Sequence, residues 1–345
     1  MKKVIVTGGN GFIGSNLIKF LIQKKYFVIN IDKNVYSKFS YILKDLNKKN
    51  YIFYKLDINN RSKINNILRK HKPKVIFNLA AETHVDRSID NPKNFIQSNI
   101  IGTFNLLQIF KEFSKKNKTK LIHISTDEVY GDVLHGRSSE NYAYQPSSPY
   151  AASKAASDHL VSSYVRTYKI PAIITNCSNN YGPYQFPEKL VPHMILNGLS
   201  GKPMPIYGDG SQIRDWLYVE DHAHALLKVV SNGKLGETYM IGGGNERTNL
   251  EVVRLICDLL DEFIIEKPNG INSFRDLISF VADRPGHDGR YAIDATKIQR
   301  ELGWSPKESL ESGMRKTVLW YLKNKVWWER VLSGSYALDR IGIER

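Results

Sequence analysis

The chain has 345 residues, enough for two domains of ordinary size or one large one. Its composition, 42% hydrophobic and 24% charged, excludes a disordered or fibrous chain. The net charge is +15, and its excess lies within residues 1–120, where 24 Lys and Arg against 7 Asp and Glu give +17, while the rest of the chain has −2. A basic chain can bind nucleic acid, but no basic motif interleaved with aromatic residues occurs, so we expect no nucleic-acid partner.

Cysteine usage and hydropathy bear on the compartment. Cys177 and Cys257 are the only cysteines, too few for a disulfide framework and without zinc-ligand spacing. This pattern fits a reduced, cytoplasmic setting. The apolar run near the start stops after three residues, too short for a signal peptide, and no stretch approaches the roughly 18 apolar residues of a membrane span. We therefore expect neither a membrane segment nor a metal site.

Short apolar runs and helical patterns alternate along the first half of the chain. Strands are expected at residues 4–6, 26–31, 51–54, 75–79, 121–125 and 172–175, and helices at 12–22, 63–70, 99–113 and 150–168. Strands that alternate with helices favour a parallel sheet covered by helices on both faces. The predicted fold class is α/β, a doubly wound parallel Rossmann sheet with a smaller C-terminal substrate-binding domain.

Proline and glycine become denser after residue 176, which indicates a domain boundary. We expect the sheet domain at residues 1–175, the smaller domain mainly at 176–330 and a C-terminal tail at 331–345. The stretch 215–241 again contains a helical pattern and an apolar run, so this part is expected to return to the sheet.

A glycine-rich loop joins the first expected strand to the first expected helix. Gly8, Gly11 and Gly14 give the spacing GxxGxxG, which allows a tight turn and lets the backbone approach a pyrophosphate at the helix N-terminus. Asp32 ends the second strand, where a carboxylate can accept hydrogen bonds from a ribose 2′-hydroxyl. The pattern predicts a dinucleotide site that favours NAD, although Lys33 beside the acid leaves NADP open.

Tyr150 and Lys154 are four residues apart on an expected helix and therefore share one face. A free tyrosine is a weak base at neutral pH because its pKa is about 10. A nearby ammonium, together with the positive ring of NAD⁺, would favour the phenolate and lower that pKa. In a chain that also carries a dinucleotide fingerprint, the pair predicts a proton-transferring tyrosine.

Two adjacent carboxylates, Asp127 and Glu128, follow Thr126 directly after an expected strand. The carboxyl ends of parallel strands line the ligand crevice of such a sheet. Two carboxylates there can divide acid and base duties when their surroundings separate their pKa values. The pair is therefore a candidate for acid–base catalysis.

Together these motifs resemble the extended short-chain dehydrogenase/reductase family (NAD-dependent epimerases and dehydratases), and within it most closely the dTDP-glucose 4,6-dehydratases. The resemblance runs from residue 1 to about residue 327, nearly the whole chain. It is carried by long segments at residues 79–89, 125–131, 176–184, 212–221 and 283–287. The sheet domain would then bind NAD and the smaller domain a sugar nucleotide.

The resemblance implies dehydration of dTDP-glucose to dTDP-4-keto-6-deoxyglucose, the entry to deoxysugar biosynthesis, with NAD⁺ regenerated in each turnover. It implies that Tyr150 takes the proton of the sugar 4-hydroxyl, which Thr126 holds, while Lys154 binds the nicotinamide ribose. Glu128 would remove the proton on carbon 5, and Asp127 would protonate the departing 6-hydroxyl. To act as an acid near neutral pH, Asp127 needs a raised pKa. The family also implies a homodimer formed by the helices at 99–113 and 150–168.

The same resemblance assigns the remaining contacts residue by residue. Cofactor contacts are expected at Gly8, Gly11, Phe12, Ile13, Gly14, Asp32, Asp57, Ile58, Leu79, Ala80, Ala81, Ser98, Tyr150, Lys154 and Asn180. Sugar-nucleotide contacts are expected at Thr83, Thr126, Asn179, Lys189, Leu190, Pro205, Ile206, Tyr207, Arg214, Asn249, Asp283, Arg284 and His287. We interpret His84, Asp86 and Arg87 as structural residues, and His123 as a hydrogen-bonded core histidine.

Alternative functions remain open at this point. A UDP-glucose 4,6-dehydratase or a sugar-nucleotide 4-epimerase would share most of these motifs, although 4-epimerases lack both carboxylates after the position of Thr126. A non-catalytic NAD-binding regulator is a remote alternative, because it would not need the five proposed catalytic residues together. The chain departs from the family in the loop at 33–39, which lacks a glycine turn, and in a shorter segment at 132–146.

Overall fold

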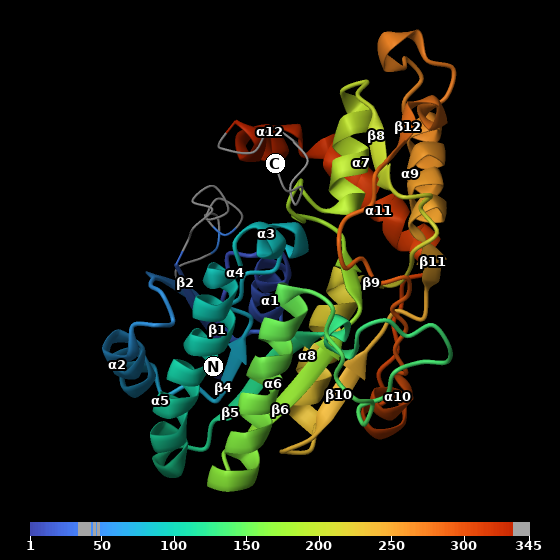
Figure 1. The fold of residues 1–345 in the computed structure, drawn as a ribbon. Helices are drawn as coiled ribbons and strands as arrows, with labels where there is room; N and C mark the ends of the chain where they lie inside the picture. Colours follow the sequence, from blue (N-terminus) through green and yellow to red (C-terminus); the bar gives the residue numbers. More distant parts are fainter. Residues whose placement is uncertain (34–42, 44–45, 47–48, 334–345) are drawn as a thin grey trace.

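A parallel sheet forms the centre of the first part of the chain. The computed structural model describes residues 1–33, 43, 46 and 49–333. Within them, seven parallel strands pair in the order β10-β6-β5-β4-β1-β2-β3 (Figure 1). Their bounds are β1 Lys3–Thr7, β2 Phe27–Asp32, β3 Tyr51–Lys55, β4 Val75–Asn78, β5 Lys120–Thr126, β6 Ala172–Cys177 and β10 Thr238–Ile241. A sheet that starts at its centre and winds outward in both directions is a Rossmann sheet, which confirms the predicted fold class.

Helices cover both faces of this sheet because successive strand residues point to opposite sides. Val4 and Val6 of β1 pack into one hydrophobic cluster and Ile5 into another. The first cluster receives residues of α1 (Phe12–Gln23), α8 (Val219–Asn232) and α10 (Thr296–Leu302). The second receives residues of α2 (Arg61–His71), α5 (Gly102–Lys116) and α6 (Pro149–Tyr168). The two buried layers hold the sheet rigid, and its carboxyl edge can then position side chains.

Short helical segments connect β4 to α5 and extend β5. Between β4 and α5 the chain forms α3 (Val85–Asp90), α4 (Pro92–Phe95) and the π-helix η2 (Ile96–Ile101). The 3-10 helix η3 (Asp127–Tyr130) follows β5 directly. The sequence pattern did not predict the π-helical turn, because an apolar period does not separate π from α geometry.

A second hydrophobic core lies in the C-terminal part of the chain, drawn at the upper right of Figure 1. Its helices are α7 (Leu190–Leu199), α9 (Asn249–Phe263), α11 (Leu310–Lys323) and α12 (Lys325–Leu332), with the 3-10 turns η4 (Pro268–Gly270) and η5 (Phe274–Leu277). Its strands form two small sheets, β11-β9-β7 and β12-β8, with bounds β7 Asn179–Tyr181, β8 Met204–Tyr207, β9 Ile213–Tyr218, β11 Glu246–Thr248 and β12 Ile278–Val281.

The chain returns to the large sheet after entering this second part. Strand β10 pairs in parallel with β6, and α8 packs on the sheet face beside α1. Except for Lys33, the altered loop at 33–39 lies outside the described residues, as do residues 334–345 of the tail. In the part of the chain that the structure describes, no helix combines the length and the apolar character needed to cross a membrane.

Candidate active site

A cavity of about 320 Å³ opens at the carboxyl edge of the large sheet. Five of its lining residues end or directly follow neighbouring strands: Gly8 after β1, Asp32 of β2, Leu79 after β4, Thr126 of β5 and Cys177 of β6. The parallel register therefore brings the ends of five strands to one crevice, as expected for ligand sites in this kind of sheet. The volume lies in the range of small-molecule sites.

The glycine-rich loop forms one wall of the cavity. Gly8 has φ +69, and a Cβ atom there would lie 2.7 Å from the backbone nitrogen of Ala80. A Cβ on Gly14 would meet the carbonyl oxygen of Gly8. No side chain caps the start of α1 at Gly11, so its first N–H groups remain without an intrahelical partner. The loop packs closely enough that only glycine fits, and it exposes N–H donors suited to a pyrophosphate.

The acid that ends β2 also lines the cavity. The Oδ2 atom of Asp32 accepts a hydrogen bond from the backbone N–H of Asn10 at 3.0 Å. The neighbouring Lys33 Nζ donates to Glu82 Oε1 at 2.7 Å and to Ser98 Oγ at 3.0 Å. Its charge is therefore neutralised by Glu82 and is not aimed at a phosphate. Together with the glycine loop, these contacts fit a dinucleotide whose ribose 2′-hydroxyl is unmodified.

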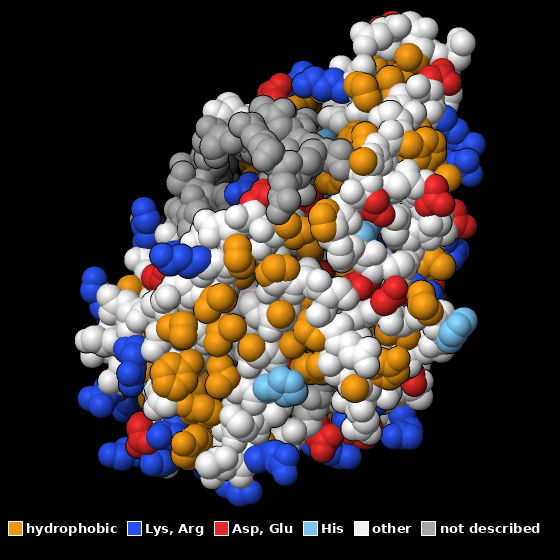
Figure 2. Space-filling view, in the orientation of Figure 1, with side chains coloured by type: hydrophobic (Ala, Val, Ile, Leu, Met, Phe, Trp, Pro, Cys, Tyr) orange, Lys and Arg blue, Asp and Glu red, His pale blue; other side chains and the backbone are white. Residues whose placement is uncertain are grey.

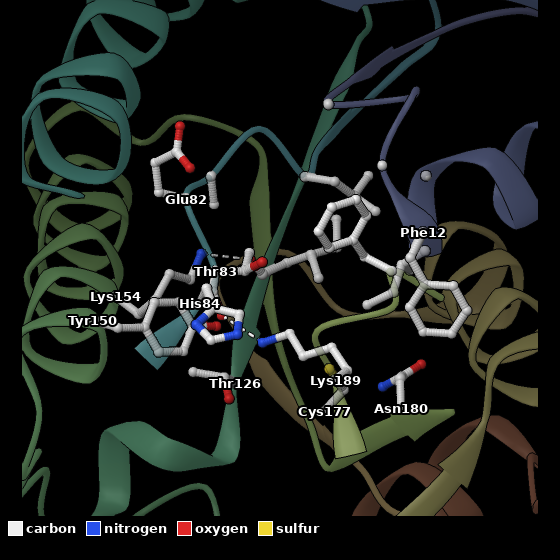
Figure 3. Close-up of a pocket in the computed structure, with 18 of the residues that line it drawn as sticks. Phe12, Glu82, Thr83, His84, Thr126, Tyr150, Lys154, Cys177, Asn180 and Lys189 are labelled. Carbon is white, nitrogen blue, oxygen red and sulfur yellow. Dashed lines mark hydrogen bonds between the residues drawn. The ribbon is translucent and has the colours of Figure 1, made fainter. Parts of the chain in front are cut away.

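Tyr150 and Lys154 enter the cavity from α6, on the side opposite Phe12 (Figure 3). The helix begins at Pro149, and the Ser148 side chain caps it by accepting from the N–H of Ala151. Lys154 is buried, and its Nζ donates to the carbonyl oxygen of Ile124 at 2.8 Å. Burial lowers the pKa of Lys154.

The expected effect of Lys154 on Tyr150 is not produced by the protein's own groups. Burial holds the pKa of Tyr150 well above its ordinary value, and the charge of Glu128 raises it further. The ammonium of Lys154 is bound to a backbone carbonyl, so it is not paired with the phenol. The spacing correctly predicts one shared helix face, and the predicted lowering of the pKa of Tyr150, which also invokes the positive ring of NAD⁺, stays a prediction.

The two adjacent carboxylates lie on η3 at the end of β5. Thr126 Oγ1 caps this turn, accepting from the Glu128 N–H at 3.3 Å and donating to Asp127 Oδ1 at 3.3 Å. Asp127 is 3% exposed, and its Oδ2 atom has no hydrogen-bond partner among the described residues. Burial, followed by the charge of Glu128, raises the pKa of Asp127 well above its usual range. Both effects favour the protonated carboxyl, which is the direction that an acid at this position needs.

Glu128 is surrounded by cations. Burial raises its pKa, and the charges of Lys189, Arg284 and Arg214 act in the opposite direction. Adjacent carboxyls in different surroundings can thus take different protonation states. The arrangement can supply a proton from one carboxyl and accept one at the other.

The structure brings most of the expected site residues into this cavity. Those that line it are Gly8, Gly11, Phe12, Ile13, Gly14, Asp32, Leu79, Ala81, Thr83, Thr126, Asp127, Glu128, Tyr150, Lys154, Asn179, Asn180 and Lys189. Those that do not line it are Asp57, Ile58, Ala80, Ser98, Leu190, Pro205, Ile206, Tyr207, Arg214, Asn249, Asp283, Arg284 and His287.

Two of the four expected cofactor residues outside the cavity, Ala80 and Ser98, contact residues that line it. The backbone of Ala80 packs against Gly8, and Ser98 accepts from Lys33. Ile58 lies against Gly102 at the start of α5. The Asp57 carboxylate closes a turn before α2 by accepting from the N–H of Asn59 at 2.8 Å.

The expected sugar-nucleotide residues outside the cavity come from the C-terminal part. Arg214 of β9 donates to the carbonyl oxygens of Ile213 and Asp288 at 2.7 and 2.8 Å, and lies 4.1 Å from the Tyr291 ring centre. His287 Nδ1 lies 2.7 Å from Asp283 Oδ1. The others are Leu190 at the start of α7, Pro205, Ile206 and Tyr207 on β8, and Asn249 at the start of α9.

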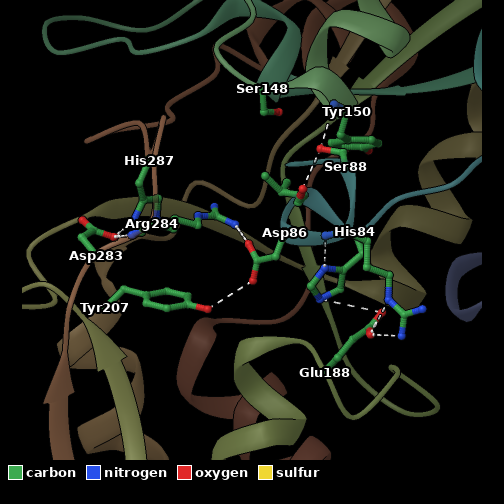
Figure 4. Close-up of polar contacts among 12 residues, drawn as sticks. His84, Asp86, Ser88, Ser148, Tyr150, Glu188, Tyr207, Asp283, Arg284 and His287 are labelled. Carbon is green, nitrogen blue, oxygen red and sulfur yellow. Dashed lines mark hydrogen bonds and ion pairs between the residues drawn. The ribbon is translucent and has the colours of Figure 1, made fainter. Parts of the chain in front are cut away.

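Sequence reasoning missed several residues of the site. His84, Asp86 and Arg87, interpreted as structural, form polar contacts with Glu188 and Arg284 of the C-terminal part, and His84 also lines the cavity (Figure 4 shows His84 and Asp86). Arg87 donates to Glu188 Oε2 through two nitrogens at 3.0 and 2.7 Å. The segment 79–89 was a sequence signal, but the partners of these three residues, Glu188 and Arg284, are over a hundred residues away. His123 is a buried core histidine as predicted, with Nε2 3.2 Å from Ser157 Oγ.

Comparison with known proteins gives consistent results. Residues 5–317 match the family described as GDP-mannose 4,6 dehydratase. A dTDP-glucose 4,6-dehydratase of Neisseria meningitidis is 54% identical over 352 residues, covering 99% of each chain. The crystal structure of a dTDP-glucose 4,6-dehydratase from Bacillus anthracis in complex with NAD is 42% identical, with TM-score 0.85, covering 96% of this chain and 100% of that one.

A second solved structure, a dTDP-glucose 4,6-dehydratase from Streptomyces venezuelae with NAD bound, is 39% identical with TM-score 0.87, and covers 95% of this chain and 99% of that one. Sequence, fold and site geometry therefore agree. The chain belongs to the GDP-mannose 4,6 dehydratase family, in which its close relatives are dTDP-glucose 4,6-dehydratases.

Proposed function

We propose that this chain removes water from dTDP-glucose, giving dTDP-4-keto-6-deoxyglucose for deoxysugar biosynthesis, with NAD as a cofactor regenerated in each turnover. The observation that carries the proposal is the pair of a buried Asp127 and a partly buried Glu128, which line one cavity together with Tyr150. The relatives described above are named dTDP-glucose 4,6-dehydratases, which is the activity proposed here. An epimerase has no elimination step and so no use for two carboxyls after Thr126.

Oxidation at carbon 4 requires a base for the sugar hydroxyl. Tyr150 would accept that proton as phenolate, with Thr126 holding the hydroxyl and Lys154 binding the nicotinamide ribose. NAD⁺, when bound, supplies a hydride acceptor that is regenerated within the turnover, and a positively charged ring beside the phenol. Because burial and Glu128 raise the pKa of Tyr150, a positive charge is needed there for the tyrosine to ionise.

Elimination of water requires a base and an acid. The 4-keto group acidifies the proton on carbon 5, and Glu128 would remove it. Asp127 would donate its proton to the departing 6-hydroxyl. The hydride removed at carbon 4 would then return to carbon 6, and Glu128 would give its proton back to carbon 5, which completes the 6-deoxy product. This division is supported by a difference between the two carboxyls: burial raises the pKa of both, but at Asp127 the charge of Glu128 adds to the rise, whereas at Glu128 the charges of three cations oppose it.

The nucleotide diphosphate needs cationic partners. Lys189, Arg214 and Arg284 all act electrostatically on Glu128, so they surround the same end of the site. A guanidinium fork matches the geometry of phosphate oxygens. We assign the diphosphate to this group, and the ribose of the dinucleotide to Asp32 at the other end.

The test is product analysis. The protein, supplied with NAD, is incubated separately with dTDP-glucose and UDP-glucose, and products are analysed by mass and for a 4-keto group. We expect loss of one water from dTDP-glucose. Loss of water only from UDP-glucose would change the assigned nucleobase of the substrate from thymine to uracil. An isomer without mass change would indicate an epimerase, and no product from either substrate would overturn the proposal.

We also propose that the chain is a cytoplasmic homodimer. Figure 2 shows hydrophobic side chains gathered over η2, α5 and α6, and Ile96, Ile101, Phe104 and Tyr168 there are exposed. Such a patch on a stable protein supports a protein–protein interface. Both cysteines are buried and free, which fits a reducing compartment. Light scattering on the purified protein should give the mass of two chains, and a single-chain mass would contradict the assembly.

A further inference from the structure

Helix α3 lies between the sheet domain and the substrate-binding segments, and contacts both. It spans Val85–Asp90 and follows the segment that leaves β4. Figure 4 shows that its side chains extend on one side toward Tyr207 and Arg284 and on another toward Tyr150. The helix is too short to bury a large apolar face, so these polar contacts determine what it holds in place.

Asp86 makes the contacts on the substrate side. Asp86 is 7% exposed, and its Oδ1 atom accepts a hydrogen bond from an η-nitrogen of Arg284. Its Oδ2 atom accepts from the Tyr207 hydroxyl at 3.2 Å. Tyr207 ends β8 and Arg284 follows its partner strand β12, so one carboxylate binds the ends of both strands of that sheet. Asp86 therefore restrains two substrate-binding candidates at once.

Arg284 keeps a donor free for a ligand while it binds Asp86. Its side chain is largely buried, and its Nε atom has no hydrogen-bond partner among the described residues. A buried N–H without a partner is costly, so native structures usually satisfy such groups. Arg284 does not line the cavity, but its charge acts on Glu128, which does, so the guanidinium lies on the same side of the site as the carboxyls.

The opposite side of α3 contacts the catalytic helix. Ser88 Oγ accepts from the backbone N–H of Tyr150 at 3.1 Å and donates to the carbonyl oxygen of Val85 at 2.6 Å. Tyr150 lies in the first turn of α6, where backbone N–H groups lack intrahelical partners. Asp86 and Ser88, two residues apart on α3, thus connect the Arg284 side chain to the backbone of Tyr150 through hydrogen bonds.

We propose that Asp86 is a positioning residue that fixes the Arg284 guanidinium for the diphosphate of a nucleoside-diphosphate sugar, in register with Tyr150 through helix α3. The identity of this ligand rests on the proposed function. Without the carboxylate, the long arginine side chain regains rotamer freedom, and its donors are no longer preorganised toward the anion.

Charge counting alone predicts the opposite result. Replacing Asp86 by a neutral residue makes the site more positive, which by simple Coulomb attraction would strengthen the binding of an anion. Positioning predicts weaker binding, because an aimed guanidinium is lost. The sign of the change in affinity therefore separates the two accounts.

The experiment is calorimetric titration of the NAD-loaded protein with thymidine diphosphate. We expect Asp86→Asn to raise the Kd about tenfold or more, in line with a lost charge-assisted contact. Asp86→Glu keeps the negative charge but displaces it, and its Kd for thymidine diphosphate should rise by a smaller factor. The matched control is Asp258→Asn, which removes the carboxylate of an exposed pair with Arg275, joined by two bonds of 2.7 Å, away from the cavity lining. It should leave the Kd unchanged.

A double-mutant cycle separates positioning from a general structural effect. If Asp86 acts through Arg284, the Asp86→Asn change should cost little once Arg284→Gln is present. With dTDP-glucose, the KM of Asp86→Asn should rise by a larger factor than kcat falls. If Asp86→Asn does not fold, the same cycle uses Asp86→Glu.

The outcomes distinguish this proposal from the proposed function. Equal or tighter binding by Asp86→Asn, or losses that add in the cycle, would overturn the positioning role while the function stands. A wild-type protein that does not bind thymidine diphosphate would overturn the assigned ligand, and this proposal with it. Weaker binding that is non-additive with Arg284→Gln supports it.

Discussion

The close packing of the glycine-rich loop leads to a prediction for Gly8→Ala. At φ +69 an alanine is strained by about 1–2 kcal/mol, because a Cβ is disfavoured in the left-handed region. Its Cβ would also lie 2.7 Å from the nitrogen and 2.8 Å from the Cα of Ala80. These are backbone atoms that cannot rotate away, and overpacking of this kind costs about 1–3 kcal/mol. The expected loss in the free energy of unfolding is therefore about 2–5 kcal/mol.

Gly136 provides a matched control with the same backbone conformation. It also has φ +69, but a Cβ there would meet no heavy atom within 4 Å. Gly136→Ala should therefore cost only the conformational part, about 1–2 kcal/mol. The difference between the two variants isolates the contact with Ala80.

Two measurements check this reasoning. Urea unfolding of the protein without added cofactor gives the two losses in stability, and NAD titration gives the affinities. Gly8→Ala should weaken NAD binding because the loop must move to relieve the contact, whereas Gly136→Ala should not. If both variants lose equal stability and bind NAD equally well, the loop is not closely packed against Ala80 and does not form the pyrophosphate site.

Two further predictions concern the acid and the base. Asp127→Asn should lower kcat about 10²–10⁴-fold, because an amide cannot donate the proton. It should also raise the melting temperature at neutral pH. The pKa of Asp127 is raised in the folded state, so the folded protein loses this proton less readily than the unfolded chain, and the carboxyl lowers the stability as pH rises above its unfolded pKa of about 3.9. A lower melting temperature with unchanged kcat would contradict both expectations. Tyr150→Phe should lower kcat by a similar factor without loss of NAD affinity, and residual activity near that of the wild type would exclude the tyrosine as base.

Local pattern was enough to predict the sheet. Apolar runs alternating with helical periods gave the strands from β1 to β6, and the glycine loop with Asp32 indicated the dinucleotide end of the cavity. These features depend on neighbours in sequence. The cavity membership of Thr126, Asp127 and Glu128 likewise follows from their place at the end of one strand, β5.

Contacts between distant segments were not predictable in the same way. Asp86 and Arg284 are 198 residues apart, and nothing in either segment shows that they meet. The spacing of Tyr150 and Lys154 also could not show that burial and the charge of Glu128, from another element, raise the pKa of Tyr150. Ser98, expected to contact the cofactor, lies outside the cavity lining and accepts a hydrogen bond from Lys33, which does line the cavity. Long-range packing and burial determine all three.

The most direct test of the central claim uses the double variant Asp127→Asn with Glu128→Gln. In a single turnover with dTDP-glucose, oxidation at carbon 4 is followed by the absorbance of reduced nicotinamide, and water loss by the mass of the quenched product. The account predicts that oxidation survives and reduced nicotinamide accumulates, while water loss falls at least about 10²-fold. Equal loss of both steps, or elimination at the wild-type rate, would contradict the assignment of acid and base to these two carboxyls.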